Sequence, residues 1–235
     1  MRREGYEFQV SRPEVIYKSI DDVVSEPMEH VIIDVPDEFV GVVIENLGQR
    51  KGEMKNMIQV QGNTRLEFVI PARGLLGFRS EFMTQTKGTG ILHHNFHGYE
   101  PFKGEIVHRN RGALIALENG SAVAYGMSKL QERSTFFIEP GTKVYRGMIV
   151  GENSREHDMV INVCKTKHLT NMRASGSDEA IRLEPPRIHS LEQAIEWIGD
   201  DEYVEITPCA IRLRKRYLDH NERNRMSKKK TEVAG

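Results

Sequence analysis

The alternation of apolar and polar residues predicts one compact unit over residues 25–100. Two segments place apolar residues at spacings of three and four, as one face of a helix does, and four segments alternate as strands. The resulting order β-α-β-β-α-β predicts a ferredoxin-like domain, an antiparallel sheet with both helices on one face. In chain order the predicted elements are residues 29–35, the helix at 40–47, residues 54–60, residues 64–71, the helix at 75–82 and residues 91–96.

After Glu100-Pro101 the pattern changes to short strands separated by glycines. Asn119-Gly120 is a strong hairpin signal and predicts that residues 113–117 pair with residues 121–124. Ser190 begins the one clear helix, because its hydroxyl can cap the helix reciprocally with Gln193. The whole chain is therefore predicted to be α+β, with a mostly β domain of one or two helices at residues 101–218.

Both ends of the chain are predicted to lie outside these domains. Residues 1–24 alternate poorly around Arg12-Pro13 and run into an acidic stretch, so we expect the end of a preceding domain and a linker. Residues 219–235 are polar and basic, which predicts a flexible tail.

Composition restricts the class of protein. The chain has 235 residues, of which 38% are hydrophobic and 29% charged, as in ordinary globular proteins. No apolar run approaches the roughly 20 residues that span a bilayer, and no signal peptide opens the sequence, so we expect no membrane contact and a cytoplasmic protein. Cys164 and Cys209 match no metal-ligand spacing and are expected to be reduced and buried.

The charges are unevenly distributed although the net charge is only −1. Residues 212–230 contain nine Lys or Arg, opposed by Asp219 and Glu222 alone. Such a basic stretch on a mildly acidic body favours a partner that carries phosphates, although a tail that only aids solubility remains the alternative.

A second basic segment follows a predicted strand. Met159, Ile161 and Val163 alternate as a half-buried strand does, and residues 164–176 then contain no Asp or Glu. Cationic groups in such a loop can displace counterions from phosphates, which favours a polyanionic ligand. The alternative interpretation is a solvated basic loop that binds no ligand. The candidate contacts to such a polyanion are Lys165, Lys167, His168, Thr170, Asn171, Arg173 and Ser175, with Arg212, Arg214, Lys215 and Arg216 as further candidates on a later strand.

Several motifs resemble one protein family in the same order along nearly the whole chain. Residues 47–52 (L-G-Q-R-K-G) and 71–79 (P-A-R-G-L-L-G-F-R) are similar to domain V of the elongation factor G family, in the variant found in the TypA/BipA translational GTPases. The loop at residues 167–176 (K-H-L-T-N-M-R-A-S-G) resembles the signature loop of the TypA/BipA C-terminal domain. The other matching motifs are residues 88–90 (G-T-G), 141–145 (G-T-K-V-Y), 190–194 (S-L-E-Q-A) and 211–215 (I-R-L-R-K).

The resemblance implies a ribosome- and RNA-binding region of a translation factor, associated with ribosomes in the cytoplasm. Domain V would sit in the ribosomal factor-binding site, and the last domain would contact large-subunit ribosomal RNA and the acceptor end of A-site tRNA. The remaining partners would be the GTPase and β-barrel domains of the intact protein. GTP and Mg²⁺ are expected in that GTPase domain, and no cofactor is expected in this chain.

Enzymatic readings have weak support. The sequence contains no G-x-x-x-x-G-K-[ST] phosphate loop, so we expect neither GTP binding nor hydrolysis. Ser154, His157 and Asp158 lack the elbow that presents a hydrolase serine, and on a strand His93 and His94 point to opposite faces, which argues against a metal site. The competing functional class is a protein-interaction module that docks the GTPase body or another factor without touching RNA.

Overall fold

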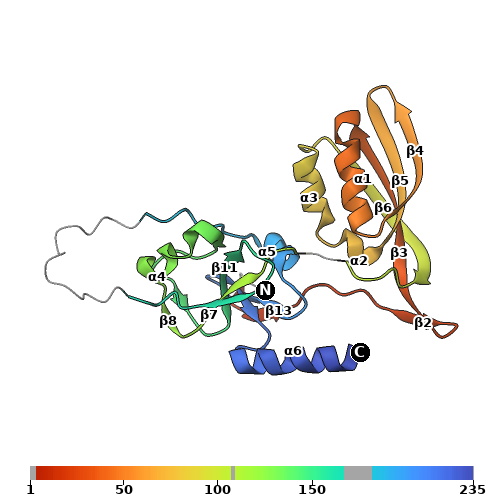
Figure 1. Ribbon diagram of the computed structural model, residues 1–235. Coiled ribbons are helices and arrows are strands. Elements are labelled where there is room, and N and C mark those ends of the chain that lie inside the picture. The colour runs from red at the N-terminus through yellow and green to blue at the C-terminus, as the bar shows by residue number, and fades with distance from the viewer. Residues whose placement is uncertain (1–3, 107–108, 167–181, 235) are drawn as a thin grey trace, which may run out of the picture. The chain divides into compact units, whose positions relative to one another are not determined.

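The structure, a computed structural model, describes residues 4–106, 109–166 and 182–234 (Figure 1). The chain forms two compact units. We call Pro13–His108 the ferredoxin-like unit, and Met1–Arg12 together with Arg109–Gly235 the C-terminal unit. In the sequence, the first unit is thus inserted between two parts of the second.

The ferredoxin-like unit is built on the long strand β3. This strand pairs antiparallel with β5 on one edge and with β6 on the other, and its first residues pair with β2. Strand β4 completes the sheet beside β5, which confirms the predicted fold class. The elements are β2 (Lys18–Ile20), β3 (Val23–Pro36), α1 (Val40–Gln49), β4 (Glu53–Val60), β5 (Asn63–Pro71), α2 (Ala72–Leu75), α3 (Phe78–Gln85) and β6 (Ile91–Pro101).

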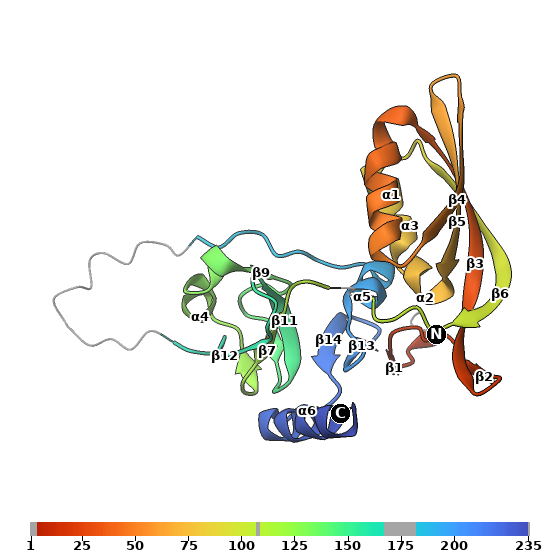
Figure 2. The same cartoon turned by 45° about the vertical axis from the view of Figure 1, so that its right-hand side comes forward.

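One face of this sheet is apolar because alternate residues of β3 and β5 point the same way. Helices α1 and α3 both lie against that face (Figures 1 and 2). The core combines the apolar residues of the two strands with those of the two helices. Its fully buried members are Val31, Ile33, Val35, Val43, Leu47, Leu66, Phe68, Ile70, Phe78 and Phe82.

The second predicted helix is interrupted. Gly77 has a φ of 75°, in the left-handed region, so the backbone turns between α2 and α3. Phe78 and Phe82 still share one face of α3, and their rings lie 5.7 Å apart. The periodicity therefore identified the buried residues correctly but not the break.

The boundary between the two units also differs from the expected one. Strand β6 continues through Gly98 to Pro101 and remains paired with β3 as far as Ser25, and the division between units falls at His108 and Arg109. The change in sequence pattern at Glu100-Pro101 marks the end of the regular sheet rather than the end of the unit.

The C-terminal unit contains a sheet of order β1-β13-β14-β11-β7-β12, with β9 also paired to β11. A separate two-stranded sheet joins β8 and β10. The strands are β1 (Phe8–Val10), β7 (Ala113–Ala116), β8 (Gly120–Ser121), β9 (Ser134–Phe136), β10 (Lys143–Val144), β11 (Met148–Asn153), β12 (Met159–Ile161), β13 (Glu202–Ile206) and β14 (Ile211–Lys215). The helices are α4 (Ala124–Ser128), α5 (Leu191–Trp197) and α6 (His220–Ala234).

Strands β7 and β11 separate two apolar cores. Leu114 and Val150 face one core, which α4 and the segment after β12 help to enclose. Ile115 and Ile149 face the other, which α5 covers together with β13 and β14. Every residue of β7 and β11 is buried for this reason. On α5, Ser190 and Gln193 form the predicted capping box.

Three local expectations for the C-terminal unit are wrong. Strand β7 does not pair with β8 as a hairpin; it lies between β11 and β12, and β8 pairs with β10. Strand β1 pairs with β13, so these early residues belong to the sheet of this chain. Residues 220–234 form helix α6 instead of a flexible tail.

The two cysteines are both free, but only Cys164 is partly buried, whereas Cys209 is exposed. The expectation of two buried thiols is therefore wrong for Cys209, which lies in the turn between β13 and β14. Among the residues described, no helix combines the length and apolar character needed to cross a membrane.

Candidate nucleic-acid interface

The basic loop begins at a well-anchored point of the C-terminal unit. Strand β12 runs parallel to β7, and Val163, just after it, is buried and accepts a hydrogen bond from the backbone N–H of Val123. The Asn162 side chain accepts from the N–H of Cys164 and donates to Glu118. The chain therefore enters the loop from a fixed position.

The chain returns from the loop to the same core. Leu183 packs against the core that contains Val163. Arg187 donates its backbone N–H to Phe136 O and pairs with Glu152 through its guanidinium, at 3.1 Å. Residues on both sides of the loop are thus held by one core.

Most of the predicted loop contacts fall outside the described residues. Lys165 is described and is exposed. The candidates that lie outside the described residues are Lys167, His168, Thr170, Asn171, Arg173 and Ser175.

The candidates on β14 separate by face. Leu213 and Lys215 are buried, whereas Arg212 and Arg214 are half-buried on the opposite face. Arg216 is exposed just beyond the strand, with its guanidinium 5.7 Å from the ring of Tyr217. The structure therefore leaves Arg212, Arg214 and Arg216 accessible to a partner.

Lys215 is not accessible, so its assignment as an RNA contact is wrong. It is 2% exposed, and its Nζ lies 2.6 Å from Asp158 Oδ2, 3.0 Å from Asp201 Oδ2 and 2.7 Å from Glu202 Oε1. Arg109 completes this ion cluster by donating to both oxygens of Glu202, at 2.8 and 3.0 Å. The cluster ties β14 to the chain before β7, the start of β12 and the start of β13.

Electrostatic attraction outweighs burial in this cluster. Burial alone would lower the pKa of Lys215, but the nearby Glu202, Asp158 and Asp201 carboxylates raise it overall. Burial would raise the pKa of Asp158, yet the Lys215 charge and the N–H of Ala113 hold that pKa below its ordinary value. Both groups are therefore charged at neutral pH.

The depressed pKa of Asp158 predicts acid sensitivity. A carboxylate with a lower pKa in the folded state stabilises the fold above its ordinary pKa of 3.8, and this contribution is lost as pH falls toward the folded pKa. The Asp158→Asn variant should therefore be less stable at neutral pH but lose less stability between about pH 5 and about pH 2. Urea midpoints of both proteins across that range measure the effect. Parallel curves would contradict it.

Helix α6 adds a basic surface, formed by residues that the sequence predicted to be a flexible tail. Arg225, Lys228 and Lys229 are exposed on it. The sequence contains a signal for the start of this helix, because Asp219 is followed three residues later by Glu222, a helix-capping pattern. In the structure Asp219 accepts hydrogen bonds from the N–H groups of Asn221 and Glu222. The start of the helix is fixed further by Arg223, which donates to the carbonyls of Tyr217 and Leu218.

Two histidines of β6 contact side chains of β3. His94 lies 3.2 Å from Glu29, and His97 has a ring contact with His30 at 6.4 Å. Within the described part of the chain, no group of three or more His, Cys, Asp or Glu side chains could hold a metal ion.

Comparison with known proteins gives two adjoining family matches. Residues 23–110 match the elongation factor G C-terminus, and residues 111–220 match the TypA/BipA C-terminal domain. The division between these matches lies two residues from the boundary between the two structural units.

Three similar relatives are each named large ribosomal subunit assembly factor BipA. The protein of Bacillus subtilis is 50% identical over 98% of this chain, that of Synechocystis 54% identical over 92%, and that of Salmonella typhimurium 50% identical over 97%. The chain spans 36–38% of the length of these relatives. With its two C-terminal domain matches in sequence, the chain belongs to the TypA/BipA family and carries the C-terminal region of its members.

Proposed function

We propose that this chain is the ribosome- and RNA-binding region of a BipA-like translation factor that acts in the cytoplasm on the large ribosomal subunit. The observation that carries the proposal is the anchored base of the basic loop, where Val163 and Leu183 hold both ends on one core. Large-subunit ribosomal RNA and the acceptor end of A-site tRNA are the proposed ligands. The relatives' name, which refers to assembly of the large ribosomal subunit, supports the same partner.

The proposed contact surface combines the loop with the accessible arginines. Lys165 stands exposed where the loop begins, and Arg212, Arg214 and Arg216 lie on the accessible side of β14. Guanidinium groups grip phosphate with two hydrogen bonds or stack on unpaired bases, so they suit folded RNA. GTP and Mg²⁺ belong, in this proposal, to the GTPase domain of the intact protein rather than to this chain.

Replacing Arg173 tests the loop. Cosedimentation of Arg173→Ala with ribosomes across a salt series should show weaker binding, because one phosphate contact is lost. The slope of log affinity against log salt should fall in magnitude by roughly 0.7–0.9. We expect the melting temperature to stay unchanged, since a side chain that serves only in RNA binding contributes little to the stability of the unbound protein.

Lys229→Ala is the matched control. Lys229 is one exposed cation on α6, with Arg225 and Lys228 nearby to substitute for it, so we expect a smaller loss of affinity. If Arg173→Ala and the parent protein bind equally with equal slopes, the loop is not the contact surface and α6 becomes the better candidate.

A protein-interaction module is the second candidate function. Several apolar side chains are exposed where β2 meets β3: Ile20 is 42%, Val23 47% and Val24 57% exposed. An apolar interface is less sensitive to salt than phosphate contacts are. Binding to ribosomes that persists unchanged at high salt would favour this function over RNA contact.

A further inference from the structure

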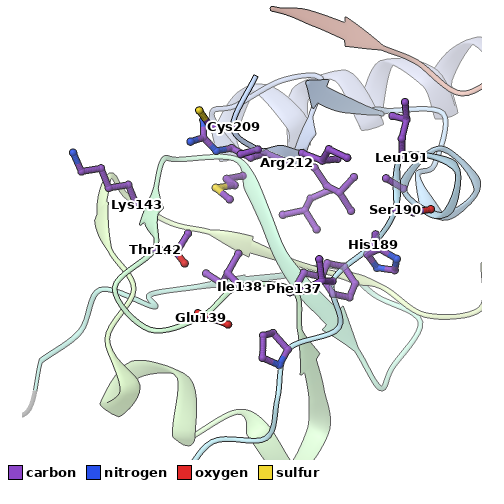
Figure 3. A pocket seen from close by; sticks show the side chains of 18 residues that line it. Phe137, Ile138, Glu139, Thr142, Lys143, His189, Ser190, Leu191, Cys209 and Arg212 are labelled. Carbon is purple, nitrogen blue, oxygen red and sulfur yellow. The ribbon is translucent and has the colours of Figure 1, made fainter. Parts of the chain in front are cut away.

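A groove opens in the C-terminal unit because two segments share one edge of β11. Strand β14 pairs with Met148 and Ile149, while β9 pairs with Gly151–Asn153 and Phe137 donates its N–H to Val150 O. Strand β7 occupies the opposite edge of β11. The two segments diverge from the middle of β11 and leave between them a cavity of about 670 Å³ (Figure 3).

The groove has an apolar floor and a polar rim. Ile149, Leu213 and Ala194, all of them core residues, contribute to its lining. Phe137 and His189 contribute an aromatic wall, with their rings edge to face at 4.5 Å. The rim residues are Glu139, Thr142, Lys143, Ser190, Cys209 and Arg212.

The two cations of the rim, Lys143 and Arg212, are candidate phosphate contacts, although Glu205 lies directly opposite Arg212 in the register of β13 and β14. Among the salt bridges between described residues, none involves Lys143 or Arg212. In the view of Figure 3 both lie toward the end of the groove at Cys209, whereas His189 and Ser190 lie at the other end. Among the described residues that line the groove, Glu139 is the one acidic side chain. It would repel a phosphate placed beside it but can accept a hydrogen bond from the amino group of a base.

We propose that this groove binds one unpaired nucleotide of an RNA, with the base on the apolar floor and its phosphate held by Lys143 and Arg212. The volume lies within the roughly 300–1,000 Å³ typical of small-ligand sites. Single-stranded RNA is recognised by burying splayed bases against apolar and aromatic side chains while cations hold the backbone. The inference rests on the proposed RNA-binding function and adds a site that is separate from the basic loop.

Cys209 provides a direct readout of occupancy. Its thiol is exposed and lines the groove. Cys164 is partly buried, and burial, with a smaller effect of Glu118, raises its pKa, so its thiolate forms less readily. Peptide mass spectrometry can follow the rate at which iodoacetamide modifies each cysteine. The rate at Cys209 then reports whether the groove is occupied, and the rate at Cys164 serves as an internal reference.

The probes are a single-stranded RNA pentanucleotide, the same sequence as a duplex, and adenosine 5′-monophosphate. At ten times its dissociation constant, the single strand should slow modification of Cys209 roughly tenfold. Adenosine 5′-monophosphate should also protect Cys209 at sufficient concentration, whereas the duplex should not, because its bases are paired. Modification of Cys164 should be unaffected.

Lys143→Ala should weaken the protection, and Lys129→Ala is its matched control. Both lysines are exposed in the same unit, but Lys129 lies over the Tyr125 ring and does not line the groove. Fluorescence anisotropy with a longer RNA measures total binding separately. If that RNA binds but no probe protects Cys209, the groove is not a nucleotide site, and the proposed RNA-binding function is unaffected.

Other outcomes also separate the two proposals. Protection by adenosine 5′-monophosphate without binding of the longer RNA would support the nucleotide site and count against the proposed function. Protection by an acidic, leucine-containing peptide but by neither nucleotide probe would show that the groove takes a protein partner, and would overturn the inference.

Discussion

Replacing Lys215 with methionine is expected to destabilise the C-terminal unit by about 3–5 kcal/mol. Lys215 lies within hydrogen-bonding distance of Asp158, Asp201 and Glu202, and Glu202 is fully buried. Methionine fills similar space but leaves these carboxylates with Arg109 as their remaining cation in the cluster. Removing the cation costs more than the ion pair itself contributes, because the fully buried Glu202 carboxylate stays desolvated, whereas Asp158 and Asp201 are exposed enough to be hydrated.

Urea unfolding followed by tryptophan fluorescence measures this effect. The chain has one tryptophan, Trp197, and the Arg109 guanidinium lies 4.1 Å from its ring, so the signal comes from the affected unit. Arg214→Met is the matched control, since its half-buried side chain points away from the cluster, and should cost less than about 1 kcal/mol. A stable Lys215→Met protein that binds ribosomes weakly would instead restore Lys215 as an RNA contact.

Replacing Phe82 with alanine is expected to destabilise the ferredoxin-like unit by about 3–5 kcal/mol. Phe82 is fully buried in the core between the sheet and the helices and contacts the ring of Phe78. The cavity cannot collapse easily, because α3 is held beside α1 by hydrogen bonds from Asn46 to Gln85 and from Arg50 to Glu81. The cost therefore includes both lost burial and a cavity.

Circular dichroism and tryptophan fluorescence together test this prediction. The thermal transition that circular dichroism reports for the ferredoxin-like unit should shift down, whereas the transition seen by Trp197 should stay in place. The reason is that, among the described residues, the core around Phe82 has no member in common with the cores of the C-terminal unit. Met83→Ala, on the same helix but 41% exposed, should change little. An equal shift of both signals would mean that the two units unfold as one.

The sequence identified most of the ferredoxin-like unit because its contacts follow local periodicity. Alternation along residues 29–35 and 64–71 selects the buried face of the sheet, and the spacing of Val40, Val43, Ile44 and Leu47 selects the face of α1 that packs on it. The turn between β4 and β5 also suits its local residues. Gln61 and Gly62 have φ values of 48° and 82°, as a tight hairpin turn requires.

The C-terminal unit was less predictable because its contacts join distant parts of the chain. Strand β1 pairs with β13 almost two hundred residues later. The hairpin that Asn119-Gly120 predicts does not form, because β7 pairs with β11 and β12 instead. Short strands contain too few residues to specify a partner, so burial on both faces of β7 and β11 decides the pairing.

The candidate site was likewise predictable from the sequence only in part. The sequence by itself determined the family motifs, the acid-free loop and the alternation that puts Arg212 and Arg214 on one side of β14. Only the tertiary structure decided that Lys215, on the other side, meets carboxylates from β13 and from the chain before β12, and that β14 and the segment after β9 diverge to open a groove. The reason is physical: alternation fixes which side chains share a face, whereas their charge partners and cavities depend on segments that only folding brings together.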